Sequence, residues 1–210
     1  MNWFKDFVPN WKTALAADKW LLPKMIFLLT IGNFNPYLFS IILPILQKRE
    51  GTMIPDPLLD MIDPSDVSRM IFMLLYSGLA ITILWLLAYP KELKVGMKLY
   101  VVISYMRMIT VYMIPLEPPT GLIYLSDPIL SAAVYKGHII TKDLFFSGHT
   151  ATIVSCFMMN HHPILKWLVG FFAVSISYLL LVQHIHYTVD IVGAWMFSFL
   201  IYKFLTAEEK

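Results

Sequence analysis

The sequence predicts an all-α fold: a polytopic integral membrane bundle of about six transmembrane helices, preceded by an interfacial amphipathic helix. Three observations support this prediction. The chain has 210 residues and is 58% hydrophobic, which exceeds the roughly 45–50% of soluble domains. Only 14% of the residues are charged. The apolar residues also fall in runs near the length of about 20 residues that a helix needs to cross a bilayer.

Six apolar runs are the candidate spans, and together they form one predicted transmembrane domain. This domain covers residues 25–205, between an N-terminal segment, 1–24, and a tail, 206–210. The predicted spans are residues 25–46, 70–88, 97–115, 147–160, 164–182 and 187–205. The first contains Pro36 and Pro44, so we expect it to be kinked or broken. The fourth is short for a membrane span.

The N-terminal segment has the pattern of an interfacial helix. Large apolar side chains recur at helical spacing, with lysines between them: Phe4, Phe7, Val8, Trp11 and Leu15. Such a helix lies in the plane of the membrane surface. We expect it to be interrupted near Pro9.

The positions of lysine and arginine predict the orientation, because these residues are enriched in cytoplasmic loops. With six spans, the side that holds both termini carries ten of them and the opposite side carries five. Both termini are therefore expected in the cytoplasm. The loop before residue 147 and the turn before residue 187 are expected on the non-cytoplasmic face.

Charge and cysteine content argue against a nucleic-acid-binding protein and against sites built from several cysteines. The net charge is only +2, which does not support a broad basic surface for nucleic acid. Cys156 is the only cysteine, so the chain has neither an internal disulfide nor a multi-cysteine metal site.

His186 and Asp190 form the first candidate catalytic motif. They stand four residues apart at the start of the last predicted span, so on a helix they share a face. Such side chains are costly in hydrocarbon and usually serve a function there. The carboxylate can accept a hydrogen bond from one imidazole nitrogen and leave the other to attack phosphorus. The alternative is a buried polar pair that only joins two helices.

Ser147, Gly148 and His149 form the second motif, at the start of the fourth predicted span. Ser147 suits a helix N-cap, Gly148 lets the backbone approach a ligand closely, and a helix start attracts phosphate. His149, on the first turn, can protonate a departing alkoxide. Taken alone, these residues are equally a simple helix cap. The expected position of both motifs on one face of the membrane favours catalysis.

Two segments resemble the catalytic motifs of the sphingomyelin synthase family: residues 143–150, Asp-Leu-Phe-Phe-Ser-Gly-His-Thr, and residues 186–190, His-Tyr-Thr-Val-Asp. This family is part of the superfamily of lipid phosphatases and phosphotransferases that includes the type 2 phosphatidic acid phosphatases. Residues 107–112 and 115–119 resemble a stretch upstream of these motifs. The resemblance spans residues 105–190 and agrees in order and spacing.

The resemblance implies a ping-pong transfer, with His186 as nucleophile, Asp190 as its partner and His149 as general acid and then base. His186 would displace diacylglycerol from a phospholipid and hold the phospho-head-group as a phosphohistidine. The implied partners are a phospholipid donor and a lipid-alcohol acceptor such as ceramide or diacylglycerol. No metal or cofactor is implied.

The candidates for substrate binding are Arg107, Asp143, Ser147 and Gly148. Arg107 is the intramembrane cation, and it either tethers Asp143 or Glu117 or binds phosphate directly. Asp143 is either a loop cap or a head-group ligand. The sequence leaves both pairs of alternatives open.

Other polar residues near the motifs carry weaker indications. His138 and Lys142 lie in the predicted outward loop, where they could attract phosphate. His184 precedes His186 by two residues. It could donate a hydrogen bond that supports the site, but we expect an interfacial histidine without a special task.

One position distinguishes phosphate removal from head-group transfer. Type 2 phosphatidic acid phosphatases carry an arginine six residues before the nucleophilic histidine, and that position here is Leu180. A phosphomonoester dianion needs more guanidinium contacts than a phosphodiester monoanion. We therefore expect transfer of a phosphodiester head group. Attack by water, as in a lipid phosphatase or a phospholipase C-like hydrolase, is the nearest alternative.

Two interpretations from other classes remain open. His149, His184, His186 and Asp190 could ligate zinc, as in intramembrane amide hydrolases, although neighbouring His-x-His side chains do not share a helix face. A non-enzymatic lipid-binding membrane protein is the other. It predicts that removing these polar side chains leaves function intact.

Overall fold

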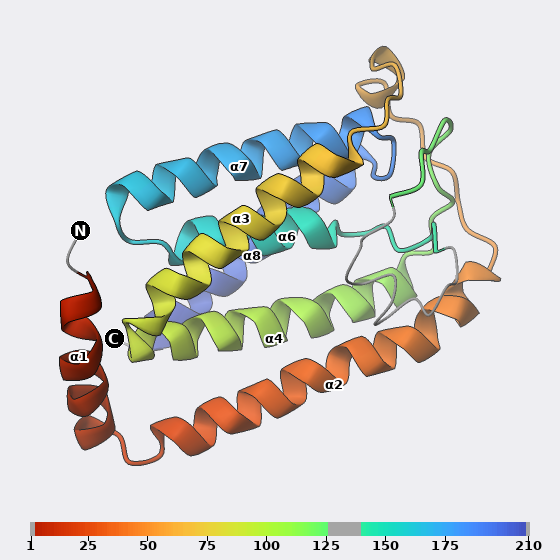
Figure 1. The fold of residues 1–210 in the computed structure, drawn as a ribbon. Helices are drawn as coiled ribbons and strands as arrows, with labels where there is room; N and C mark the ends of the chain where they lie inside the picture. Colours follow the sequence, from red (N-terminus) through yellow and green to blue (C-terminus); the bar gives the residue numbers. More distant parts are fainter. Residues whose placement is uncertain (1–2, 126–139, 209–210) are drawn as a thin grey trace.

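The computed structural model describes residues 3–125 and 140–208, and its regular structure is helical (Figure 1). These residues form seven α-helices and one short 3-10 helix, Leu59–Met61. The α-helices are α1 Trp3–Ala17, α2 Leu21–Gln47, α3 Ser68–Leu87, α4 Pro90–Met113, α6 Gly148–Met159, α7 Pro163–Val182 and α8 Thr188–Glu208. The predicted all-α fold is confirmed for this part of the chain.

Four of the described helices are long and apolar enough to cross a membrane: α2, α3, α7 and α8. α4 is 24 residues long but carries several lysines and Arg107. α6 is only 12 residues long. The total of about six transmembrane helices, the interfacial role of α1 and the cytoplasmic position of the termini therefore stay predictions.

The short helix α6 lies at the centre of the bundle, where it packs against α3, α4, α7 and α8. Ile153 and Val154, in its middle, are fully buried. A helix enclosed by other helices does not have to match the thickness of the bilayer, because protein surrounds it instead of lipid. Its length fits this central position.

Pro9 does not interrupt α1, contrary to our prediction, and α2 is unbroken, so of the two outcomes expected for its prolines the break is wrong. α1 continues through Pro9, and α2 continues through Pro36 and Pro44. Each proline removes one hydrogen bond of the helix, but tertiary contacts hold the chain in place. In α1, Asn10 donates to the carbonyl oxygen of Ala88 at 2.8 Å, and α2 packs along α4.

The two ends of the chain lie at one end of the bundle, and the irregular segments gather at the other (Figure 1). Two of these segments are residues 48–67 and 114–125. A third, residues 140–147, leads directly into α6. The candidate catalytic residues lie at this second end, because α6 and α8 both begin there.

Candidate active site

His186 and Asp190 make the predicted contact. His186 lies in the turn between α7 and α8, and its Nδ1 is 3.1 Å from Oδ2 of Asp190, on the first turn of α8. The same oxygen accepts the backbone N–H of Tyr187 at 3.0 Å. Asp190 is fully buried. The carboxylate thus orients the imidazole through Nδ1 and leaves Nε2 for chemistry.

The start of α6 is built as predicted and is joined to the start of α8. Ser147 is the N-cap, and its Oγ accepts the N–H of Thr150 at 3.3 Å. The backbone N–H of Ser147 donates to the carbonyl oxygen of Asp190 at 3.2 Å. The two motifs, far apart in the sequence, are therefore in direct backbone contact. Because α6 begins here, the positive end of its dipole also points to this region.

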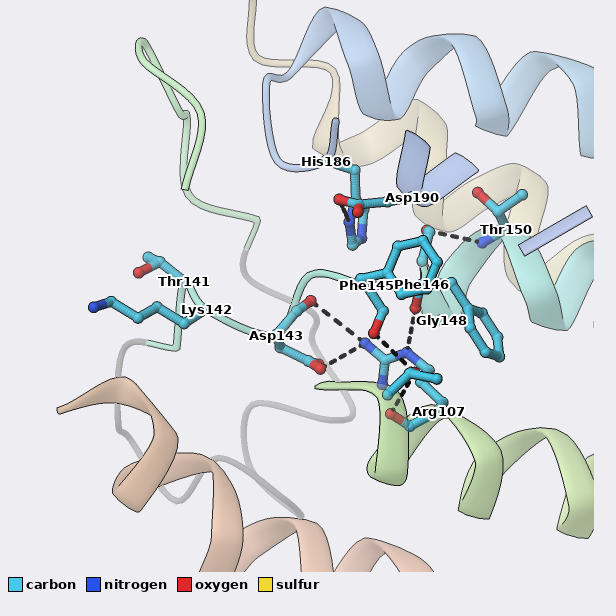
Figure 2. A network of polar contacts seen from close by, with 12 residues as sticks. Arg107, Thr141, Lys142, Asp143, Phe145, Phe146, Gly148, Thr150, His186 and Asp190 are labelled. Atoms are coloured by element: carbon cyan, nitrogen blue, oxygen red, sulfur yellow. Dashed lines mark hydrogen bonds and ion pairs between the residues drawn. The ribbon is translucent and has the colours of Figure 1, made fainter. Parts of the chain in front are cut away.

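Arg107, on α4, forms an ion pair with Asp143, with 2.7 Å between Nη2 and Oδ1 (Figure 2). Its Nε donates to the carbonyl oxygen of Phe146 at 2.8 Å, and its guanidinium lies 5.5 Å from the ring centre of Phe39. Of the two tethers that the sequence left open, the structure therefore has Asp143. The pair still borders the cavity described below, so tethering and phosphate binding are compatible roles.

Gly148 allows this arrangement in a way the sequence did not reveal. A Cβ atom at this position would lie only 2.9 Å from Cζ and Nε of Arg107. We expected Gly148 to let the backbone approach a ligand. In the structure, the missing side chain makes room for the guanidinium.

Four of the predicted residues border one small cavity of about 60 Å³: Arg107, Asp143, His149 and His186. The other three are Ser147, Gly148 and Asp190. Ser147 caps α6, Gly148 makes room for the Arg107 guanidinium, and Asp190 orients His186. The structure thus gathers all seven predicted site residues at one end of the bundle. Two imidazoles, a guanidinium and a helix start around one cavity can bind a phosphate and move a proton at its edge.

Asp56 supports the site, and the sequence analysis missed it. Its carboxylate accepts the backbone N–H of Thr188 at 2.6 Å and the Thr188 hydroxyl at 2.9 Å. It therefore caps α8 from a position 132 residues earlier in the chain. Burial raises the pKa of Asp56, but the bonds from Thr188 and Leu59 outweigh burial and hold the pKa below its ordinary value. No local pattern links these positions.

His184 has a structural task, contrary to our prediction. Its Nδ1 lies 2.8 Å from the carbonyl oxygen of Thr120, and its Nε2 lies 2.8 Å from that of Ile62. The ring thereby joins both loop segments to the turn that carries His186. His184 also has a φ of 54°, a left-handed conformation that is uncommon for residues other than glycine.

Lys142 forms an ion pair with Glu117, with 2.6 Å between Nζ and Oε1. The Lys142 ammonium and the backbone N–H of Gly51 stabilise the charged carboxylate and lower the pKa of Glu117. Lys142 thus joins loop segments, and its predicted role in attracting phosphate stays a prediction. His138 lies outside the described residues.

The zinc interpretation finds no cluster of ligands in residues 3–125 and 140–208. No three His, Cys, Asp or Glu side chains converge there in a way that could hold a metal ion. His184 is instead directed at two carbonyl oxygens.

Comparison with known families finds a similarity in the part of the chain that carries most of the candidate site. Residues 142–207 match the family model described as PAP2 superfamily C-terminal. That range holds every predicted site residue except Arg107. No curated protein shows a significant sequence match to the chain. The matched range is 66 of the 210 residues, so the match shows a similarity to the PAP2 superfamily over about a third of the chain. The four apolar helices indicate an integral membrane protein.

Proposed function

We propose that this protein transfers a phospho-head-group from a glycerophospholipid to ceramide or a similar lipid alcohol, through a phosphohistidine at His186. The observation that carries the proposal is the 3.1 Å contact between His186 and the buried Asp190, at a cavity that Arg107 and His149 also border. This geometry provides a nucleophile, a charged partner, a cation and an acid–base group in one place.

In the first step, the lone pair of His186 Nε2 attacks phosphorus, and the bond between phosphorus and the glycerol oxygen breaks. His149 donates a proton to that oxygen, so diacylglycerol leaves as the neutral alcohol. Asp190 stabilises the positive charge that the phosphorylated imidazole carries. The guanidinium of Arg107 and the start of α6 lie where they can stabilise charge on the phosphoryl oxygens.

In the second step, the hydroxyl group of the acceptor lipid gives its proton to His149, which is now neutral. Its oxygen attacks phosphorus, and the bond between phosphorus and His186 breaks. The products are the new phospholipid and the enzyme in its starting protonation state.

The environment of Leu180 supports transfer rather than phosphate removal. Leu180 is fully buried in the apolar core between α3, α6 and α7. The position at which type 2 phosphatidic acid phosphatases carry an arginine therefore contributes no charge here. One guanidinium, itself paired with Asp143, suits a phosphodiester monoanion better than a phosphomonoester dianion.

The test uses the purified protein and a phospholipid labelled in its head-group phosphate, with and without ceramide. We expect a labelled lipid product that depends on ceramide. Head-group release at the same rate without ceramide would show a hydrolase instead.

Trapping the intermediate tests the nucleophile separately. We expect an acid-labile phosphoenzyme in the wild type and none in His186→Ala. His161→Ala is the matched control, since His161 is an exposed histidine beyond the far end of α6. A phosphoenzyme that persists in His186→Ala would refute the assignment.

A further inference from the structure

A large apolar cavity of about 680 Å³ extends from the catalytic end into the bundle, between α2, α3, α4 and α6. His149 and Arg107 border it at one end, and Met159 borders it at the other. His149 and Met159 lie near the two ends of α6, about 15 Å apart at 1.5 Å per residue. The cavity therefore continues from the catalytic residues along most of this helix.

Within the part of the chain that the structure describes, a polar side chain in the wall of this cavity has an amide nitrogen without a hydrogen-bond partner. Asn35, on α2, borders the cavity and is only 4% exposed. Its Nδ2 is buried and has no hydrogen-bond partner among the residues that the structure describes. A buried amide without a partner is costly and uncommon. Such a group is expected where a ligand supplies the missing bond.

The surroundings of Asn35 explain why its amide is not used within α2. Asn33, two residues earlier, donates to the carbonyl oxygen four residues before it, that of Leu29, at 2.8 Å. The equivalent carbonyl for Asn35 belongs to Ile31, and it already accepts the hydroxyl of Tyr105 at 3.1 Å. Asn33 therefore bonds to a carbonyl oxygen of its own helix, whereas the equivalent carbonyl oxygen for Asn35 is already bonded to Tyr105 of α4.

Asn35 also lies at a defined depth below the phosphate-binding end. Phe39, four residues later on α2, has its ring 5.5 Å from the guanidinium carbon of Arg107. One helical turn is about 5.4 Å, so Asn35 lies about one turn further into the bundle than the guanidinium. In a glycerophospholipid, the ester carbonyl groups lie at this level, a few bonds from the phosphate and before the acyl chains.

We propose that Asn35 binds an acyl ester carbonyl of the phospholipid donor while its chains occupy the apolar cavity. The amide N–H donates to the carbonyl oxygen and fixes how deeply the lipid enters, which sets phosphorus at the height of His186. Asn35 is thus a positioning residue. This inference rests on the proposed function, and it adds that the enzyme distinguishes ester-linked from ether-linked donors.

The test compares a diacyl phosphatidylcholine with its dialkyl ether analogue, which has the same chains and head group but no carbonyl oxygens. Equilibrium binding and turnover are both measured on the full-length protein. We expect the wild type to bind the diacyl lipid about tenfold more tightly, the value of one hydrogen bond to an otherwise unpaired buried group. In Asn35→Leu, the two lipids should bind with similar affinity.

Asn33→Leu is the matched control, because Asn33 borders the same cavity but its amide is bonded within its own helix. It should keep the preference for the diacyl lipid. Asn35→Ala is a second variant, and melting temperatures confirm that each variant is folded. An ester-to-ether affinity ratio that is equal in wild type, Asn35→Leu and Asn35→Ala would overturn the inference. Tight, Asn35-dependent binding without any turnover would instead refute the proposed function and leave this inference standing.

Discussion

Replacing Gly148 with alanine tests whether the position of the Arg107 guanidinium controls the reaction. The new Cβ atom would lie 2.9 Å from Cζ and Nε of Arg107, whereas ordinary contacts begin at 3.4 Å. The guanidinium must therefore move by about 0.5 Å, the difference between these two distances. It cannot do so without straining its 2.8 Å bond to the carbonyl oxygen of Phe146 or its 2.7 Å contact with Asp143.

The size of the effect follows from the bond that is lost. A hydrogen bond that involves a charged group contributes about 1.5–3 kcal/mol, and each 1.36 kcal/mol corresponds to tenfold in rate. We expect kcat/KM for head-group transfer in Gly148→Ala to fall by about 10- to 150-fold. Stability should fall by less than this, because alanine favours the helix over glycine by up to about 1 kcal/mol, which offsets part of the lost bond.

The assay is transfer of a radiolabelled head group in detergent micelles, together with a melting temperature for each protein. Gly170→Ala is the control. A Cβ atom there would also meet a close neighbour, the ring of Phe157 at 3.0 Å, but on α7 and away from the cavity. A Gly148→Ala protein with kcat/KM within twofold of wild type would refute the reasoning, as would an equal loss in Gly170→Ala.

Three further substitutions test the supports of the site. Asp190→Asn keeps the shape of the side chain but removes the charge beside His186, so kcat should fall by up to about 10,000-fold with unchanged helicity by circular dichroism. A loss below tenfold would contradict the nucleophile assignment. Asp56→Ala should lower the free energy of unfolding by about 1–2 kcal/mol at neutral pH, because it removes the cap of α8 at Thr188. Folding lowers the pKa of Asp56 below its ordinary value, so its contribution to stability is present at neutral pH and is lost as the pH falls through the folded pKa. The difference in melting temperature between Asp56→Ala and wild type should therefore be smaller at pH 3 than at pH 7. His184→Gly suits the positive φ but removes both ring contacts. We expect the free energy of unfolding to fall by about 2 kcal/mol and amide hydrogen exchange to become faster in residues 183–187. Exchange equal to wild type would show that the ring does not hold this turn.

The helix starts that carry the candidate site were predictable because their signals are local. Ser147 is a typical N-cap, and α6 begins directly after it. His186 and Asp190 are four residues apart, and one turn of backbone brings them into contact. The sequence predicted that Arg107 would pair with Asp143 or Glu117 but not which of the two, because local pattern does not tell which acidic loop residue lies nearest to the guanidinium.

The supports were not predictable, because they depend on contacts between distant segments. Asp56 bonds to a residue 132 positions away, and nothing in its local sequence distinguishes it from other loop aspartates. The task of His184 depends on two carbonyl oxygens from two different loops. Local rules also overstated how far proline interrupts a helix: α1 stays helical through Pro9, and α2 is unbroken at Pro36 and Pro44 while it packs along α4.

The bond from the backbone of Ser147 to the backbone of Asp190 has a consequence for how this protein can evolve. A backbone contact does not depend on which side chains surround it. The apolar residues lining the large cavity can therefore be exchanged one at a time while the spacing between the two histidine-bearing helix starts is kept. On the proposed function, the catalytic frame and the cavity that would select lipids are thus separable under mutation, and new lipid preferences are accessible without rebuilding the site.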